Sequence, residues 1–226
     1  MKTLLLSSLI LFSASSFAST VKDPQGALKA LFGYLGKPNY ERDIRCGDKS
    51  ELYGSARATG ITVQSMELTQ EILCEGDNKI LRTTLNNSQG MLQRMAGADA
   101  ELFTNLEPAD LVLSQDDYEA DYQDFIFQGL NLLDEKLDLT ISSIHEGRAY
   151  GPNGDKIPAM IIRARAEIND EAVPERLRTL DVTLYFNKDL PAISRLFQVD
   201  IGGGKVLGRN TLKGSLRVVE LKQGTR

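Results

Sequence analysis

The chain has 226 residues, of which 42% are hydrophobic and 25% charged, the composition of an ordinary globular protein. Its formal net charge of −5 argues against general nucleic-acid binding, because that function needs a basic surface. The absence of tryptophan weakens any expectation of a carbohydrate-stacking platform, although tyrosine could substitute.

Residues 1–18 have the pattern of a secretory signal peptide. Lys2 supplies the positive start, an apolar run covers 4–12, and Ser16-Phe17-Ala18 places small residues at the cleavage site. The run is much shorter than the roughly twenty residues of a membrane-spanning helix, so we expect cleavage near Ala18 rather than anchoring. We therefore predict that 19–226 form a single exported domain, secreted or periplasmic, that does not span a membrane.

The first predicted element of the mature chain is an amphipathic helix over 23–36. Asp23 and Pro24 are typical of an N-cap and a first helical residue, and Gly36 is typical of a helix end. Apolar residues recur between them at helical spacing, namely Leu28, Leu31, Phe32 and Leu35.

The next stretch, 39–59, is polar and contains glycines, which predicts a loop with at most a short strand. Apolar and polar residues then alternate over 66–75 and return over 80–85, which predicts a hairpin that turns at 76–78. Cys46 and Cys74 are the only cysteines. Because exported proteins meet oxidising conditions, we predict that they form a disulfide; two separate buried thiols are the alternative.

The longest predicted helix covers 116–136 and follows Pro108, which opens a helical region. Large apolar side chains recur at steps of three, four and seven residues, and Gly129 weakens the pattern without ending it. Acidic residues between them could attract calcium, but the central glycine of an EF-hand loop is missing, which favours a solvated helix face. These acids are Asp116, Asp117, Glu119, Asp121 and Asp124.

From residue 137 onward, five stretches alternate between apolar and polar residues, which predicts an antiparallel meander. Gly151–Gly154 is a turn signal. Gly202–Gly204 matches neither nucleotide-binding fingerprint in its spacing, so we interpret it as a hairpin turn. The predicted fold class is α+β: a curved antiparallel sheet of about seven strands, with two main helices, near Leu28 and Phe125, packed on one face.

Three groups of residues are candidates for function. His145, the only histidine, could serve a hydrolase as a general base, but no Gly-x-Ser-x-Gly motif supplies a nucleophile, and an inert strand-end histidine is favoured. A basic row could meet an anionic surface or an acidic partner, unless it pairs across strands with acids such as Asp181. An apolar group could line a ligand site between helix and sheet, unless it fills the core. The basic row is Arg209, Lys213 and Arg217, and the apolar group is Met66, Phe125, Phe186 and Phe197.

The sequence therefore predicts a non-catalytic binding or envelope-accessory protein without cofactor or metal. Its partner would be an apolar ligand or an envelope protein. A hydrolase acting on envelope polymers or esters is the alternative, and a structural component of an assembly is a third reading.

Overall fold

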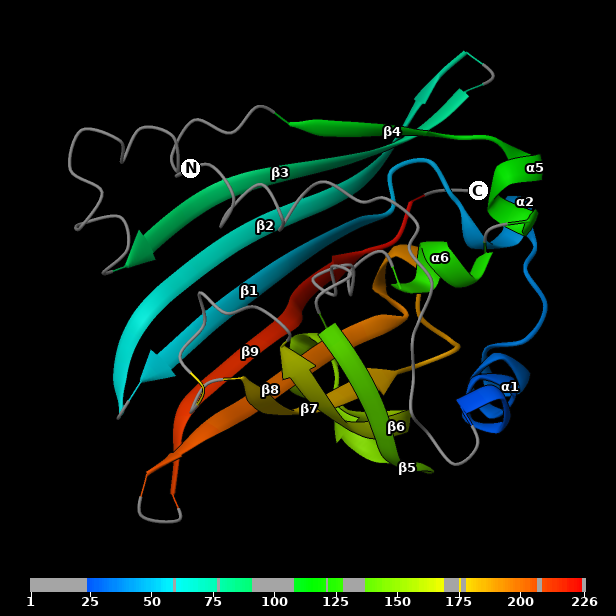
Figure 1. Ribbon diagram of the computed structural model, residues 1–226. Helices are drawn as coiled ribbons and strands as arrows, with labels where there is room; N and C mark the ends of the chain where they lie inside the picture. The colour runs from blue at the N-terminus through cyan, green and yellow to red at the C-terminus, as the bar shows by residue number, and fades with distance from the viewer. Residues whose placement is uncertain are drawn as a thin grey trace.

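The computed structural model describes residues 24–58, 60–76, 78–90, 108–120, 122–127, 137–168, 175, 178–206 and 209–224 (Figure 1). The predicted signal peptide, residues 1–18, lies outside them. The described strands form one nine-stranded antiparallel sheet in the order β4-β3-β2-β1-β9-β8-β7-β6-β5. Their bounds are β1 Lys49–Ala58, β2 Ile61–Glu75, β3 Asn78–Gly90, β4 Ala109–Leu113, β5 Leu137–Tyr150, β6 Lys156–Ile168, β7 Thr179–Phe186, β8 Leu196–Val206 and β9 Arg209–Lys222.

The sheet consists of two meanders that meet in its middle. Strands β1 to β4 pair in chain order, and so do β5 to β9, which confirms the predicted C-terminal meander. The two halves are joined by β1 and β9, whose register runs from Lys49 opposite Lys222 to Ala58 opposite Leu212. A single pairing between distant strands therefore holds the two halves in one sheet.

The described helices lie together at one end of the sheet, on the right of Figure 1. Helix α1 (Pro24–Leu35) confirms the predicted N-terminal helix, and Gly36 follows it with a φ of 81°. Helix α2 (Tyr40–Asp43) is capped by Asn39, whose side chain accepts a hydrogen bond from the backbone N–H of Arg42. None of the described helices is both long and apolar enough to cross a bilayer.

The predicted long helix over 116–136 is described as two short ones, α5 (Gln115–Ala120) and α6 (Tyr122–Phe127). Residues 128–136 lie outside the described part of the chain. The Ser114 hydroxyl accepts a 3.1 Å hydrogen bond from the Asp117 N–H and donates a 2.6 Å one to the Asp117 carboxylate, which fixes the start of α5. Asp117 thus serves as part of a helix cap.

The main core lies between the helices and one face of the sheet, which we call the inner face. Residues of α1, α2, α5 and α6 pack there against alternating residues of β6, β7 and β8. Among its most deeply buried members are Leu31, Ile44, Ile72, Ile162, Ala166 and Phe186. A second, smaller cluster contains Ala159, Ile161, Phe197 and Val218.

The predicted α+β fold class, with about seven strands and two main helices, is wrong, because the chain is mostly antiparallel sheet and its described helices are short. The expected loop over 39–59 contains β1, and the expected helical region after Pro108 contains β4. The alternation of apolar and polar residues that marks a strand cannot be recognised in β1, because only one of its inner-face positions carries a large apolar side chain. Those positions are Ser50, Leu52, Gly54 and Ala56.

The glycines Gly202–Gly204 do not form the predicted hairpin turn but lie within β8. A Cβ at Gly203 would collide with the Leu180 side chain and lie 2.9 Å from the Thr179 carbonyl oxygen of β7. The glycine therefore permits a close approach of two strands. By contrast, the turn predicted at Gly151–Gly154 is confirmed: it contains a short 3-10 helix, η4 (Pro152–Gly154).

Candidate functional site

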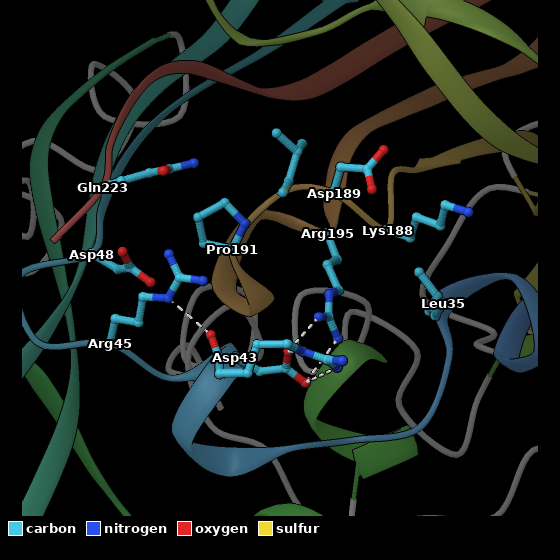
Figure 2. Close-up of a pocket in the computed structure, with 11 residues that line it drawn as sticks. Leu35, Asp43, Arg45, Asp48, Lys188, Asp189, Pro191, Arg195 and Gln223 are labelled. Atoms are coloured by element: carbon cyan, nitrogen blue, oxygen red, sulfur yellow. Dashed lines mark hydrogen bonds and ion pairs between the residues drawn. The ribbon is translucent and has the colours of Figure 1, made fainter. Parts of the chain in front are cut away.

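A pocket of about 340 Å³ opens beside the main core (Figure 2). Figure 2 shows that segments distant in the chain converge on it: α2, the loop before β1, the β7–β8 connection and the residue after β9. Side chains of both charges line it, so the pocket is polar. The lining residues are Leu35, Arg42, Asp43, Arg45, Asp48, Lys188, Asp189, Leu190, Pro191, Arg195 and Gln223.

An ion pair between Asp43 and Arg195 forms one wall of the pocket. The Arg195 Nη2 atom lies 2.7 Å from Asp43 Oδ1, and Nη1 lies 3.3 Å from Oδ2, so the guanidinium holds the carboxylate with two hydrogen bonds. Only 1% of the Asp43 side chain and 4% of the Arg195 side chain is exposed. Such a pair withstands burial only when further hydrogen bonds satisfy both partners.

Those further hydrogen bonds come from α2, α5 and α6. The Arg42 Nε donates to Asp43 Oδ1 over 2.7 Å, and the Tyr118 hydroxyl donates to Oδ2 over 3.1 Å. Arg195 Nη1 donates to the Tyr122 hydroxyl, whereas the buried Nε of Arg195 has no hydrogen-bond partner among the described residues. The network joins three helices to the segment that leads into β8. We therefore assign it a structural role, that of holding the helices against the sheet.

The same contacts set the charge of Asp43. Burial alone would raise the pKa of this carboxyl, but the hydrogen bonds and charges of Arg42 and Arg195 outweigh it, and the pKa lies below its ordinary value. Burial likewise opposes the charge on Arg195, whereas Tyr122 and Asp43 favour it more strongly and raise the pKa of the guanidinium. The pair is therefore ionised at neutral pH.

A pH dependence of stability follows from the lowered pKa of Asp43. A carboxyl with a depressed pKa stabilises the folded state above its unfolded pKa of about 4, and this contribution is lost as the pH falls through its folded pKa. We expect Asp43→Asn to be less stable than the wild type at neutral pH and the difference to shrink below about pH 4. Urea unfolding of both proteins across this range measures the difference, and a gap that does not change with pH would contradict the assignment.

Asp48 lies on the other side of the pocket, with 1% of its surface exposed. Burial raises its pKa, although the backbone N–H of Gly224, which donates a 2.9 Å hydrogen bond to Oδ1, and the charge of Arg45 act in the opposite direction. A Cβ at Gly224 would collide with the Cys46 carbonyl. The segment after β9 therefore fits closely against the loop that holds Asp48.

The predicted disulfide between Cys46 and Cys74 is confirmed, and it lies next to this loop. It joins the loop to the end of β2, with a Cα–Cα distance of 5.6 Å. Two backbone hydrogen bonds of 2.8 Å reinforce the same connection, from the Gly47 N–H to the Ile72 carbonyl and from the Ile72 N–H to the Asp48 carbonyl.

The lining residues of the pocket include no serine, cysteine or histidine. The groups there that could act as nucleophiles are the amine of Lys188 and the carboxylates of Asp43, Asp48 and Asp189. Within the described ranges, no group of three or more His, Cys, Asp or Glu residues is arranged to hold a metal ion. Its buried carboxylate Asp43 is fully engaged with arginines.

His145 lies exposed on β5, opposite Ile161 in register. Where the chain is described, no serine hydroxyl or carboxylate is hydrogen-bonded to it. A catalytic histidine needs such a partner to orient it or to be activated by it. The geometry therefore gives no support to the hydrolase alternative through His145.

The four residues predicted to line an apolar site do not come together. Phe125 and Phe186 belong to the main core, and Phe197 belongs to the second cluster. Met66 is half-buried on the inner face, where a Cβ at Gly54 would lie 2.8 Å from its Cγ. Only Met66 therefore lies on a partly open surface.

That surface is a band of half-buried apolar side chains across the inner face, which we call the inner-face band: Leu52, Met66, Leu68, Leu85 and Leu216. In register, Leu85 of β3 lies opposite Leu68 of β2, and Leu68 lies opposite Leu52 of β1. Three of its members, Met66, Leu68 and Leu85, belong to neither cluster of buried residues in the described chain. Figure 1 shows these strands extending away from the helices.

Two members of the basic row, Lys213 and Arg217, lie four residues apart on the opposite, outer face of β9, and both side chains are exposed. The third, Arg209, is the first residue of the same strand. Asp181, the proposed pairing partner, lies 4.0 Å from Arg165 instead. A base, Arg57 of β1, stands directly opposite Lys213.

The residues that build the polar pocket were not among the sequence predictions. Asp43 and Asp48 lie in a stretch that resembles a polar loop, where a buried acid has no distinctive pattern. One feature of the sequence could have indicated Arg195: it is the only charged residue in the mainly apolar segment 190–199. A lone arginine in such a segment must either leave the core or find an acid within it.

Comparisons with known proteins give little further guidance. No protein-family model matches the chain, and no curated protein matches it. Among solved structures, the chain is similar to the lipoprotein LppX of Mycobacterium tuberculosis, with 9% sequence identity over 89% of this chain and 94% of that chain. The TM-score is 0.30, so this similarity supports no conclusion about fold or function.

Proposed function

We propose that this chain is an exported, non-catalytic protein that binds an apolar ligand on the inner face of its sheet. The observation that carries the proposal is the inner-face band. A contiguous apolar surface left partly open is costly in water, by about 25 cal/mol for each Å² exposed, and such surfaces commonly mark binding sites. The leader pattern of residues 1–18 and the disulfide Cys46–Cys74 support export to an oxidising compartment.

Gly54 gives the band its shape. A Cβ there would lie 2.8 Å from the Cγ of Met66 and 3.3 Å from a Cδ of Leu216, so the glycine lets these two side chains approach each other over β1. The flexible thioether of Met66 suits a surface that must adapt to a ligand. A lining role for Phe125, Phe186 and Phe197 stays a prediction. The first two pack in the main core and the third in the second cluster.

A matched pair of substitutions on β2 tests the proposal. Leu68 is on the inner face, and Leu73 is on the outer face of the same strand, also half-buried. The probe is dansyl-undecanoic acid, titrated into delipidated protein and followed by its fluorescence. We expect Leu68→Asn to weaken binding about ten-fold, because it removes one apolar contact from the site, and Leu73→Asn to leave binding unchanged.

Native mass spectrometry of the protein purified from its own host provides the second measurement. We expect an apolar molecule to accompany the wild type. Saturable probe binding that Leu68→Asn and Leu73→Asn weaken equally would contradict the proposed surface. The absence of both probe binding and a co-purified molecule would contradict apolar ligand binding itself.

A further inference from the structure

The end of the sheet that carries the β1–β2 turn presents two exposed positive charges. Arg57 and Lys213 lie directly opposite each other on neighbouring strands, and both side chains are exposed. Like charges in opposed positions of an antiparallel pair destabilise the sheet. Neither side chain forms an ion pair with another residue in the described part of the chain.

The surrounding outer face offers these two bases little compensation. Thr62 and Gly202 are their other register neighbours, opposite Arg57 and Lys213 respectively. The acid nearest in register is Asp200, opposite Ser215, and its Oδ2 accepts a 2.8 Å hydrogen bond from Gln198. Arg217 continues the positive row along β9. The arrangement is therefore open to an external anion.

An apolar side chain projects at the same end. Ile61 begins β2 directly after the turn, opposite Ala58, and 63% of it is exposed, the second-highest value among the large hydrophobic residues described. Single exposed apolar residues are common on surfaces. An exposed isoleucine at a turn, close to an exposed arginine and lysine, is the combination expected of a surface that meets lipid headgroups and the first carbons of the acyl chains.

The charge distribution of the molecule would orient it on such a surface. Asp116, Asp117 and Glu119 of α5 are exposed, and Figure 1 places α5 at the upper right, while the β1–β2 turn lies at the lower left. The helical end also carries exposed bases, among them Lys29, Lys37 and Arg42, so its acidic part is α5. An anionic surface would repel the carboxylates of α5 and attract Arg57 and Lys213. This separation allows a chain with a net charge of −5 to approach an anionic membrane with one particular end.

We infer that the β1–β2 end of the sheet docks on anionic phospholipid, with Arg57 and Lys213 against headgroup phosphates and Ile61 inserted between the headgroups. An acidic protein partner would use the two bases but would not need an exposed isoleucine at the turn. The inference goes beyond ligand binding on the inner face, because the docking residues lie at the turn and on the outer face.

Vesicle co-sedimentation tests the docking. The vesicles contain either phosphatidylcholine alone or phosphatidylcholine and phosphatidylglycerol in equal amounts. We expect the wild type to bind only the second kind, and to release it as salt is raised from about 0.1 M to 1 M. Arg57→Gln with Lys213→Gln should weaken binding about 30-fold, because each base near an anionic surface contributes about five-fold. Ile61→Ser should weaken it about five-fold.

The matched control is Lys29→Gln with Lys37→Gln, which removes the same charge from exposed positions on α1 and just after it. We expect this variant to bind vesicles like the wild type. Equal losses in the two double variants, or no vesicle binding by the wild type, would overturn the docking. Binding of Ile61→Ser equal to that of the wild type would overturn the insertion step. Each variant is also titrated with dansyl-undecanoic acid. We expect the variants to bind this probe like the wild type, which distinguishes a failure of vesicle docking from a failure of the proposed ligand site.

Discussion

Replacing Arg195 with methionine is expected to lower the free energy of unfolding by about 3–5 kcal/mol, the cost of removing one partner from a buried ion pair. The substitution leaves the Asp43 carboxylate, with 1% of its side chain exposed, without its main buried partner. Methionine fills much of the same volume, so the loss reports the unpaired charge rather than a cavity. Urea unfolding followed by circular dichroism measures it.

The pair Arg165–Asp181 provides the matched control. It joins the same residue types at 4.0 Å, but 58% and 54% of its side chains are exposed. Arg165→Met is expected to cost less than about 1 kcal/mol, because exposed pairs contribute little. Adding Asp43→Asn to Arg195→Met should restore part of the lost stability by removing the stranded charge. Equal effects of the two arginine substitutions would show that the buried network does not stabilise the fold.

Removing the disulfide is expected to cost about 3–4 kcal/mol, because the bridge closes a long loop in the unfolded chain. Cys46 and Cys74 are separated by 28 residues in sequence, and both are exposed, so Cys46→Ala with Cys74→Ala should disturb little packing. The loss would then arise mainly from the added freedom of the unfolded state. Guanidinium unfolding of the oxidised wild type and of the double variant compares the two proteins.

Reduction of the wild type provides the control for this substitution. The reduced wild type and the double variant should unfold at the same denaturant concentration, since both lack only the cross-link. An oxidised protein no more stable than either would mean that the backbone hydrogen bonds around Gly47 and Ile72 already hold the loop.

The elements that can be predicted from the sequence are those that one local pattern determines. The helical spacing of Leu28, Leu31 and Leu35 predicted α1, and strict alternation predicted the five strands of the C-terminal meander. The disulfide was predicted from the number of cysteines and from the predicted, oxidising compartment. These features depend on neighbours in the chain or on a single strong chemical preference.

The elements that depend on tertiary context could not be predicted from local patterns. Strand β1 is paired on both sides, by β2 and β9, so backbone hydrogen bonds fix it although its inner positions include Gly54 and Ala56. The pocket depends on Asp43 meeting Arg195, which is 152 residues away. Such a pairing leaves no periodic trace, because it is created by the sheet that brings α2 beside the start of β8.

The pairing of β1 with β9 has a consequence for how the protein matures. Each half of the sheet can form from neighbouring segments, but the halves stay separate until the last strand inserts between β1 and β8. Before that step, both strands present bare edges that can recruit another chain. Completion of the sheet must therefore wait for the final strand, and the hazard of aggregation is greatest just before that strand inserts.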